Sequence, residues 1–498
     1  MGLTLKKRKA GILLPVSSLP SAYGIGDFGA GAYDFINFLA DSGQSIWQIL
    51  PIGPTGLHNS PYQCLSAFAG NPSFVDLNAL VMDDLLSIED ISGDWTKDEK
   101  RADYDLQVEK KIPLLIKASE NFDEKDPDYL KFVNENKDWL MDYAMFASLR
   151  RLLDAENLDA WEDRLRNPSE DIFKEIRESF ASQIKHRMII QYFFFSQWKE
   201  LKTYANSRGI SIIGDIPLYV SEDSSDFWIN RELFDVDSDG RTCTTAGVPP
   251  DEFSADGQIW NNPVYAWKTK KPELLSWWKR RIAQAAELYD GVRIDHFRGL
   301  SEYFSIPIIE GKADVECGEF LPGPGRELID MIKSNFPDFM IIAEDLGKIF
   351  QETRELLAYS EYPGMKVLQF AFAGGSGNEY LPHNHIRNSV VYTGTHDNNT
   401  ISGWVKGLDS RDLTFTKEYL GVKSSLYLPD AMIKAALSSI ADTAIIPLQD
   451  WLGLGERARF NTPSTVDGSN WRWRVSKDAL TPVLSEYIFY CTKELFDR

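Results

Sequence analysis

The sequence predicts an α/β protein built on a (β/α)8 barrel, also called a TIM barrel. Three observations support this prediction. Short apolar runs that end in polar residues, glycine or proline recur along the chain, and longer stretches with helical spacing separate them. Acidic residues also stand at the ends of several of these runs. Because the active site of such a barrel lies at the carboxyl ends of its strands, we expect those acids to share one site.

We count eight such runs and predict that each forms one parallel strand of the barrel. In order, they are residues 11–15, 45–50, 210–215, 291–295, 339–344, 365–370, 389–393 and 442–447.

The spacing of the eight runs is uneven. A plain barrel needs roughly 250 residues, whereas the chain has 498. We therefore expect one catalytic barrel domain over residues 1–498 with two insertions. Residues 53–208, between strands two and three, are expected to form a largely helical subdomain, because they contain charged amphipathic stretches. Residues 221–272, between strands three and four, are expected to form an active-site loop region.

The charge and the cysteines exclude several classes of protein. The net charge is −21, which argues against a nucleic-acid partner, because phosphate binding depends on clustered lysine and arginine. No apolar run approaches the length of about 20 residues that a membrane-spanning helix needs. The four cysteines are far apart, without metal-ligand spacing. We expect a soluble, cytoplasmic protein with free thiols.

Residues 291–299 are the most informative stretch. Arg293 and Asp295 are two residues apart on a predicted strand, so both side chains fall on the same face and within contact range. A guanidinium beside a carboxylate favours the ionised acid. We therefore expect Asp295 to be charged and nucleophilic, with a purely structural ion pair as the alternative.

Glu344 ends a strand of apolar residues. Partial desolvation raises the pKa of a glutamic acid from about 4.3 toward the range of about 6 to 7 that suits a proton donor. One ionised carboxylate and one protonated carboxyl group are the pair that retaining glycoside cleavage requires. The alternative is that Glu344 is a rim acid paired with a lysine or arginine.

Asp215, His396 and Asp397 also follow predicted strands. Any one of them could be a solvated loop residue, but several acids at one rim indicate a site. His396 has no histidine, cysteine or carboxylate three or four residues further on that would complete a local metal site. We therefore predict binding of a hydroxyl-rich ligand, and neither a metal nor another cofactor.

Two aromatic loops should overhang the rim. Residues 59–63 contain Ser60 and Tyr62. The second loop combines residues 245–253 with residues 257–263, which contain Gln258 and Trp260. Long ordered loops are usually functional. The alternative is that their aromatic residues anchor the loops to the barrel.

Taken together, these motifs resemble those of the 4-alpha-glucanotransferases called amylomaltase or disproportionating enzyme, glycoside hydrolase family 77 of the alpha-amylase clan. The resemblance spans nearly the whole chain. It is carried by residues 11–20, 59–72, 214–220, 246–263, 292–298, 343–347, 364–370, 394–397 and 449–455. The chain departs from the usual pattern at Asn399, at residues 348–350 and at Ser464.

The resemblance implies roles for the candidate residues. It implies Asp295 as nucleophile, Glu344 as acid/base and Asp397 as the carboxylate that stabilises the transition state. The remaining matches are implied to bind substrate: Ser60, Tyr62, Asp215, Gln258, Trp260, Arg293, His296 and His396. It also implies α-1,4-glucans such as starch, glycogen and maltooligosaccharides as substrates, with glucose as an acceptor.

The expected reaction is a retaining double displacement through a covalent glycosyl-enzyme. A retaining α-1,4-glucan hydrolase that uses the same carboxylates is the nearest alternative, and a non-catalytic glucan-binding barrel is a more distant one. The sequence does not determine the oligomeric state.

Overall fold

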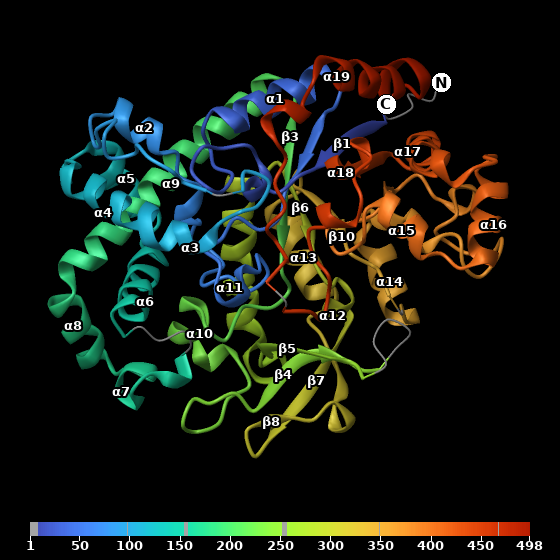
Figure 1. Ribbon diagram of the computed structural model, residues 1–498. Helices are drawn as coiled ribbons and strands as arrows, with labels where there is room; N and C mark the ends of the chain where they lie inside the picture. Colours follow the sequence, from blue (N-terminus) through green and yellow to red (C-terminus); the bar gives the residue numbers. More distant parts are fainter. Residues whose placement is uncertain (1–7, 97, 154–157, 251–255, 348, 467) are drawn as a thin grey trace.

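A computed structural model describes residues 8–96, 98–153, 158–250, 256–347, 349–466 and 468–498. Its centre is a closed barrel of eight parallel strands (Figure 1). Around the barrel the order is β1, β13, β12, β11, β10, β6, β3, β2, with β2 pairing β1 to close the ring. The strands are β1 (Lys9–Leu13), β2 (Ile46–Gln48), β3 (Ser211–Ile216), β6 (Gly291–Ile294), β10 (Met340–Ala343), β11 (Gly364–Val367), β12 (Ser389–Tyr392) and β13 (Thr443–Pro447). All eight predicted strands are confirmed.

The strands are apolar because both of their faces are covered. Every residue of β6, β11, β12 and β13 is buried. Gly291 begins β6 at a point of close approach: a Cβ atom there would lie 2.7 Å from Cβ of Met340 on β10. The absence of a side chain at Gly291 therefore lets these two strands pair.

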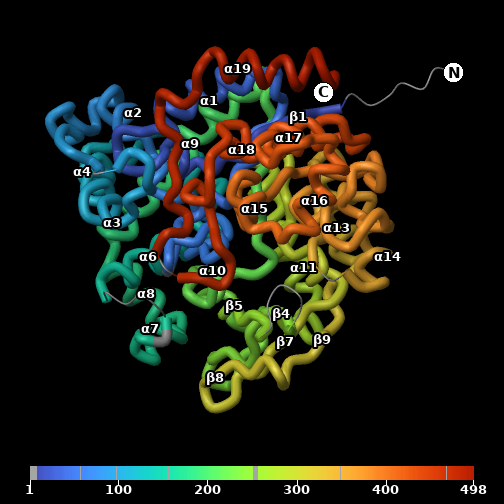
Figure 2. Tube along the Cα trace, turned by 45° about the vertical axis from the view of Figure 1, so that its right-hand side comes forward, coloured from blue at the N-terminus to red at the C-terminus, as the bar shows by residue number. Residues whose placement is uncertain are grey.

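Helices surround the barrel and cover its outer face. The larger helices outside the insertion are α1 (Ala30–Asp41), α11 (Trp267–Leu288), α13 (Arg326–Asn335), α14 (Gln351–Ser360), α15 (Ile401–Gly407), α16 (Ser410–Tyr419), α17 (Leu428–Ser438) and α19 (Pro482–Phe489). Three short helices are α10 (Ser225–Ile229), α12 (Arg298–Ser301) and α18 (Leu448–Trp451). The C-terminal helix α19 packs beside α1, as both views of the chain show (Figures 1 and 2). None of the helices in the described part of the chain combines the length and the apolar character needed to span a membrane.

The segment between β2 and β3 is helical. It contains α2 (Leu77–Met82), α3 (Tyr104–Leu106), α4 (Ile112–Asn121), α5 (Pro127–Glu135), α6 (Leu140–Leu153), α7 (Asp163–Arg166), α8 (Glu170–Ser179) and α9 (Ala181–Ser207). Helix α9 packs both on the other helices of this segment and on β3. It therefore connects the inserted helices to the barrel.

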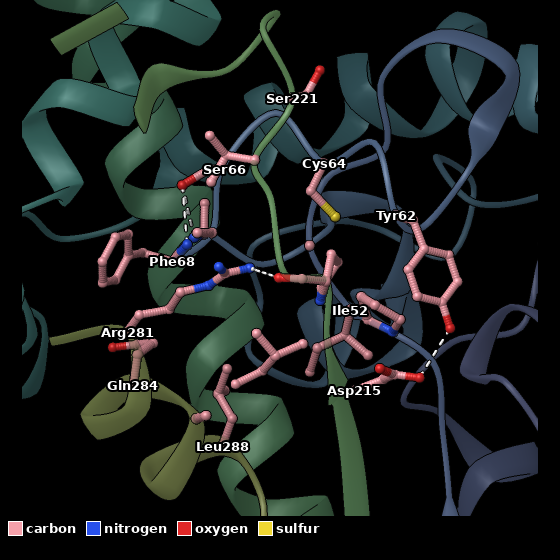
Figure 3. Close-up of a pocket in the computed structure, with 18 of the residues that line it drawn as sticks. Ile52, Tyr62, Cys64, Ser66, Phe68, Asp215, Ser221, Arg281, Gln284 and Leu288 are labelled. Atoms are coloured by element: carbon pink, nitrogen blue, oxygen red, sulfur yellow. Dashed lines mark hydrogen bonds between the residues drawn. The ribbon is translucent and has the colours of Figure 1, made fainter. Parts of the chain in front are cut away.

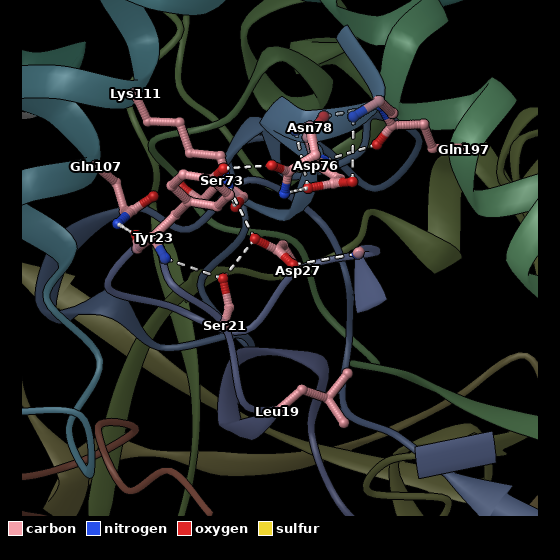
Figure 4. Close-up of polar contacts among 12 residues, drawn as sticks. Leu19, Ser21, Tyr23, Asp27, Ser73, Asp76, Asn78, Gln107, Lys111 and Gln197 are labelled. Carbon is pink, nitrogen blue, oxygen red and sulfur yellow. Dashed lines mark hydrogen bonds and ion pairs between the residues drawn. The ribbon is translucent and has the colours of Figure 1, made fainter. Parts of the chain in front are cut away.

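A buried ionic cluster also ties the inserted helices to the first βα connection (Figure 4). Lys111 is fully buried; its Nζ donates to the carbonyl of Ser73 at 2.6 Å and lies 3.7 Å from the carboxylate of Asp27. Burial raises the pKa of Asp27, and the charge of Lys111 opposes that rise. Because each buried charge is stabilised by the other, the loss of either one leaves an uncompensated charge in the interior.

A separate antiparallel sheet lies next to the barrel, and the sequence did not predict it. Its strands are β4 (Thr244–Val248), β5 (Gln258–Pro263), β7 (Glu302–Ile309), β8 (Lys312–Ala313) and β9 (Glu319–Pro322). The first two come from the predicted loop region, and the other three follow β6 in the chain. Pairing of β4 with both β5 and β7 joins these segments. Such pairing between distant short segments leaves no local periodic signal.

Candidate active site

The barrel register brings Asp295 and Glu344 to adjacent positions. Strands β6 and β10 are parallel, and Ile294 pairs with Ala343. The next residue of each strand is one of the two acids. They therefore leave neighbouring strands at the same carboxyl edge of the barrel.

Arg293 connects two carboxylates. Its Nη1 donates to both oxygens of Asp215 at 2.9 and 2.7 Å, and its Nη2 lies 2.8 Å from Oδ1 of Asp295. Arg293 and Asp215 are register partners on β6 and β3. Both of these side chains are almost completely buried, whereas that of Asp295 is 30% exposed. The expected contact between Arg293 and Asp295 is therefore present, and Asp295 is the carboxylate of the two that a ligand can reach.

Glu344 has the electrostatic environment of a proton donor. Burial raises its pKa to about 7, with the negative charge of Asp295 adding to the rise and Arg293 opposing it. Two main-chain N–H groups, those of His296 at 2.6 Å and Leu346 at 3.1 Å, also donate to its carboxyl group. Glu344 therefore exchanges a proton readily near neutral pH.

His396 and Asp397 form a charge pair after β12. His396 Nε2 lies 3.3 Å from Oδ2 of Asp397. Burial by itself lowers the pKa of His396, but the carboxylate of Asp397 outweighs it and leaves that pKa raised. Burial by itself raises the pKa of Asp397, but His396 and a 2.6 Å hydrogen bond from Asn461 hold it well below its usual range. Asp397 is therefore ionised at neutral pH.

Tyr62 links the loop after β2 to this pair. Its ring stacks on that of His396, with centroids 5.1 Å apart and an interplanar angle of 20°. Its hydroxyl donates to Oδ2 of Asp215 at 2.9 Å. Burial raises the pKa of Asp215 to about 6, although the charge of Arg293 opposes the rise. Tyr62 thus connects the overhanging loop to the ionic network below the rim.

Trp260 and His296 pack against each other in the wall of the site. The two rings meet edge to face, with centroids 4.8 Å apart. The indole N–H of Trp260 donates to Oε1 of Gln258 at 3.0 Å. Burial lowers the pKa of His296 to about 4, so this imidazole is neutral at pH 7. The result is an uncharged wall with hydrogen-bonding groups, which suits a sugar.

Ten of the eleven candidate residues line one open cleft with a volume of 1320 Å³. They are Ser60, Tyr62, Gln258, Trp260, Arg293, Asp295, His296, Glu344, His396 and Asp397. Residues 251–255, which belong to one of the predicted loops, lie outside the described residues, as does Lys348. Within the part of the chain that is described, no group of three or more histidine, cysteine, aspartate or glutamate side chains is arranged to hold a metal ion.

Asp215 is the candidate that does not face the cleft. It lines a small cavity of 60 Å³ behind Tyr62, together with Cys64, Arg281 and Gln284 (Figure 3). Its side chain has no exposed surface. Asp215 is therefore connected to the cleft by its hydrogen bonds with Tyr62 and Arg293, which both line it.

The cleft also contains residues that the sequence analysis did not single out. The ring of Trp471 lies tilted against those of both Tyr62 and His396, at centroid distances of 5.9 and 6.0 Å. Asn461 binds the carboxylate of Asp397, and Arg459 donates to its main-chain carbonyl. All three come from the loop region after β13, which has no strand or helix periodicity. An aromatic and polar composition was the only available signal.

Two carboxyl groups that line one cleft and have different electrostatic environments can perform retaining glycosyl transfer. Asp295 is ion-paired with Arg293, and Glu344 has a pKa near neutrality. One group can attack a sugar carbon while the other donates and then accepts a proton. The aromatic and hydrogen-bonding walls of the cleft suit a chain of glucose units.

Comparisons with known proteins agree with this chemistry. A family model described as 4-alpha-glucanotransferase matches residues 14–481. The chain is 43% identical over 489 residues to a 4-alpha-glucanotransferase of Streptococcus pneumoniae serotype 4, covering 97% of this chain and 96% of the relative. It is 42% identical to that of a Synechocystis species, covering 99% of both chains.

A solved structure has the same fold. The amylomaltase from Streptococcus agalactiae in complex with acarbose matches with a TM-score of 0.94 and 37% identity, covering 99% of this chain and 100% of that chain. The chain therefore belongs to the 4-alpha-glucanotransferase family, glycoside hydrolase family 77, and is a glucan-transferring enzyme built on a (β/α)8 barrel.

Proposed function

We propose that the chain moves α-1,4-glucan segments from a donor glucan to an acceptor glucan or to glucose, with Asp295 as nucleophile and Glu344 as acid/base. One observation carries this proposal: the two acids stand at neighbouring strand ends in one cleft and have different electrostatic environments. The reaction is a double displacement that retains the α configuration.

In the first step, Glu344 protonates the leaving glycosidic oxygen while Asp295 attacks the anomeric carbon. The glycosidic bond breaks and a covalent glycosyl-enzyme forms. Arg293 holds the carboxylate of Asp295 in position through their 2.8 Å contact. The released part of the donor leaves with the proton that Glu344 supplied.

In the second step, Glu344 removes a proton from the hydroxyl group of an acceptor. That oxygen attacks the anomeric carbon and displaces Asp295, which restores both acids to their starting state. Asp397 accepts hydrogen bonds from hydroxyl groups of the sugar and stabilises the positive charge of the transition state. His396 and Asn461 orient this carboxylate.

Transfer must also compete with hydrolysis. Water is more concentrated than a dilute sugar by about four to five powers of ten, so acceptor contacts must supply on the order of 6 kcal/mol in the second transition state. We assign this role to Tyr62, Gln258, Trp260 and Trp471, because they form the walls of the cleft above the acids. Ser60 stands beside them and offers a hydroxyl group to the glucan.

The test is incubation of the purified chain with maltotriose, followed by separation of the products by length. A transferase makes glucose together with oligomers longer than maltotriose. A retaining hydrolase on the same barrel produces only shorter sugars, and that result would overturn the transfer proposal.

The organisation of the chain and its location are further parts of the proposal. We propose one catalytic domain over residues 1–498 with a helical subdomain at 53–208 and an active-site region at 221–272. The position of helices α2 to α9 between β2 and β3 supports this division. We also propose a cytoplasmic location, supported by four cysteines that are all free thiols.

A further inference from the structure

A second large cleft lies beside the active-site cleft, between the inserted helices and the loop region after β13. Its volume is 810 Å³. Its lining includes four arginines, Arg150 and Arg151 of α6, Arg187 of α9 and Arg472, and the described lining includes no aspartate or glutamate. We call it the arginine cleft. In a chain with a net charge of −21, this concentration of positive charge has to be explained.

Two of the four arginines already have partners. Arg150 forms an ion pair with Asp223, with Nε 2.9 Å from its carboxylate. Arg472 donates to the carbonyl of Ala102 at 3.0 Å and lies over the ring of Tyr104. These contacts hold both side chains in place along the wall of the cleft.

Arg151 and Arg187 have no such partners. Among the described residues, neither forms a hydrogen bond or ion pair with a protein group, although Arg187 is partly buried. Burial lowers the pKa of Arg187, and the charge of Arg151 adds to this effect while Tyr143 opposes it. A partly buried guanidinium without a counter-charge is destabilising for the fold. Arg187 is such a group, and the exposed Arg151 adds a second positive charge near it. Together the two arginines indicate a site for an anion.

The arginine cleft is continuous with the active-site cleft. Several residues line both clefts: Ser60, Gln63, Trp471 and residues 461–466. Tyr143 and Tyr104 add aromatic surface to the arginine cleft, and aromatic rings pack against sugar rings as they do against other apolar faces. A glucan chain that occupies the active-site cleft can therefore extend between the arginines.

We propose that the arginine cleft binds a phosphate ester carried on a glucan whose reacting end occupies the active-site cleft. The proposal rests on the proposed function and adds a substrate class to it, phosphorylated α-1,4-glucans. The planar guanidinium groups of Arg151 and Arg187 match the oxygens of a dianionic phosphate, which accepts paired hydrogen bonds from arginine. The neutral glucan alone makes no use of these charges.

The test compares two ligands, maltoheptaose and maltoheptaose bearing a 6-phosphate, by calorimetry at low salt. The full-length Asp295→Asn variant serves as the protein, so that the ligand stays intact. We expect the phosphate to increase affinity at least about tenfold, since one charge-assisted hydrogen bond contributes roughly that factor. Added potassium chloride should reduce the gain by screening.

Arg187→Gln and Arg151→Gln should each remove most of the gain and leave the affinity for neutral maltoheptaose unchanged. Arg208→Gln is the matched control, because Arg208 caps the same helix as Arg187 and does not line the cleft. A structural arginine would destabilise the fold when replaced. We expect the thermal midpoint of Arg187→Gln without ligand to equal or exceed that of the unchanged chain.

Equal affinity for the two ligands, or a gain that survives both arginine substitutions, would overturn the proposal. Inorganic phosphate alone provides the second arm. If it binds as tightly as the phosphorylated glucan and requires Arg187, the site serves free phosphate, and the assignment to glucans is wrong. Failure of the proposed function is distinguishable, since it would appear as the absence of transfer from maltotriose by the unchanged chain.

Discussion

The main-chain N–H of His296 donates a 2.6 Å hydrogen bond to Oε2 of Glu344. To do so, His296 adopts a φ of +50°, in the left-handed region that disfavours side chains. A hydrogen bond to a carboxylate favours its ionised form, so it opposes the effect of burial on Glu344. The balance leaves the pKa of Glu344 at about 7, where the group can first donate and then accept a proton.

The first prediction concerns the dependence of donor cleavage on pH. Glu344 must be protonated to assist departure of a sugar, and its pKa is raised to about 7. The value of kcat/KM for maltotriose should therefore be high below that pH and fall as pH rises through about 7. Initial rates measured from pH 5 to pH 9, at intervals of about one pH unit, would reveal this fall as the alkaline limb of the pH profile.

A donor with a fluoride leaving group supplies the control, because fluoride departs without a proton. Its kcat/KM should lack the alkaline limb. Glu344→Gln should still release fluoride in the first step, which needs no acid, while losing cleavage of maltotriose. An alkaline limb of equal size for both donors would contradict the assignment of the limb to Glu344.

The second prediction concerns the nucleophile. Asp295→Asn keeps the shape of the side chain but removes its charge, so kcat should fall by at least about 10³-fold. Arg293 keeps its two hydrogen bonds to Asp215, so the thermal midpoint should stay within about 4 °C. Mass spectrometry with a fluoride donor should detect a glycosyl-enzyme in the unchanged chain and none in the variant.

Asp338→Asn is the surface control, since Asp338 is exposed and does not line the cleft. It should change neither kcat nor the thermal midpoint. Asp295→Asn with a rate near that of the unchanged chain would show that another group forms the covalent bond.

The barrel was predictable because its strands carry a local signal. In residues 291–295, for example, the apolar Val292 and Ile294 are fully buried, and the polar residue that ends the run marks the carboxyl edge. Since parallel strands share that edge, the sequence also predicted that Asp295 and Glu344 would meet. The contact between Arg293 and Asp295 followed from their separation of two residues in a strand.

Contacts between distant segments were not predictable in this way. Asn461 binds Asp397 across 64 residues of chain, and Trp471 reaches Tyr62 from a loop without periodicity. The antiparallel sheet escaped prediction for the same reason, because the barrel strand β6 lies between β4 and its partner β7 in the chain. Asp215 was expected among the residues that bind substrate, and the sequence did not predict that its buried side chain accepts a hydrogen bond from Tyr62.

The third prediction concerns this support by Tyr62. Tyr62→Phe keeps the ring that stacks on His396 and removes the 2.9 Å hydrogen bond to Asp215. A hydrogen bond to a charged group contributes about 1.5 to 3 kcal/mol, so kcat/KM for maltotriose should fall roughly tenfold. Initial rates over a range of maltotriose concentrations would measure the effect.

Tyr204→Phe is the matched control, because the hydroxyl of Tyr204 donates to Asn37 at 2.7 Å on the outer helices. It should reduce the thermal midpoint slightly and leave kcat/KM unchanged. Equal effects of the two substitutions on kcat/KM would mean that Tyr62 acts only through general stability.

The fourth prediction concerns Ser464 in the loop that lines both clefts. Ser464 has a φ of +62°, a conformation that costs a residue with a Cβ atom about 1 to 2 kcal/mol and costs glycine almost nothing. Glycine loses more chain entropy on folding, about 0.5 to 1 kcal/mol, so Ser464→Gly should stabilise the fold by about 0.5 to 1 kcal/mol. Denaturant unfolding would measure the difference.

Ser476→Gly is the control, since Ser476 has an ordinary φ of −75° and its side chain makes no capping hydrogen bond. This substitution should lower the stability of the fold. If both variants lose stability equally, the left-handed backbone at Ser464 carries no strain that glycine can relieve.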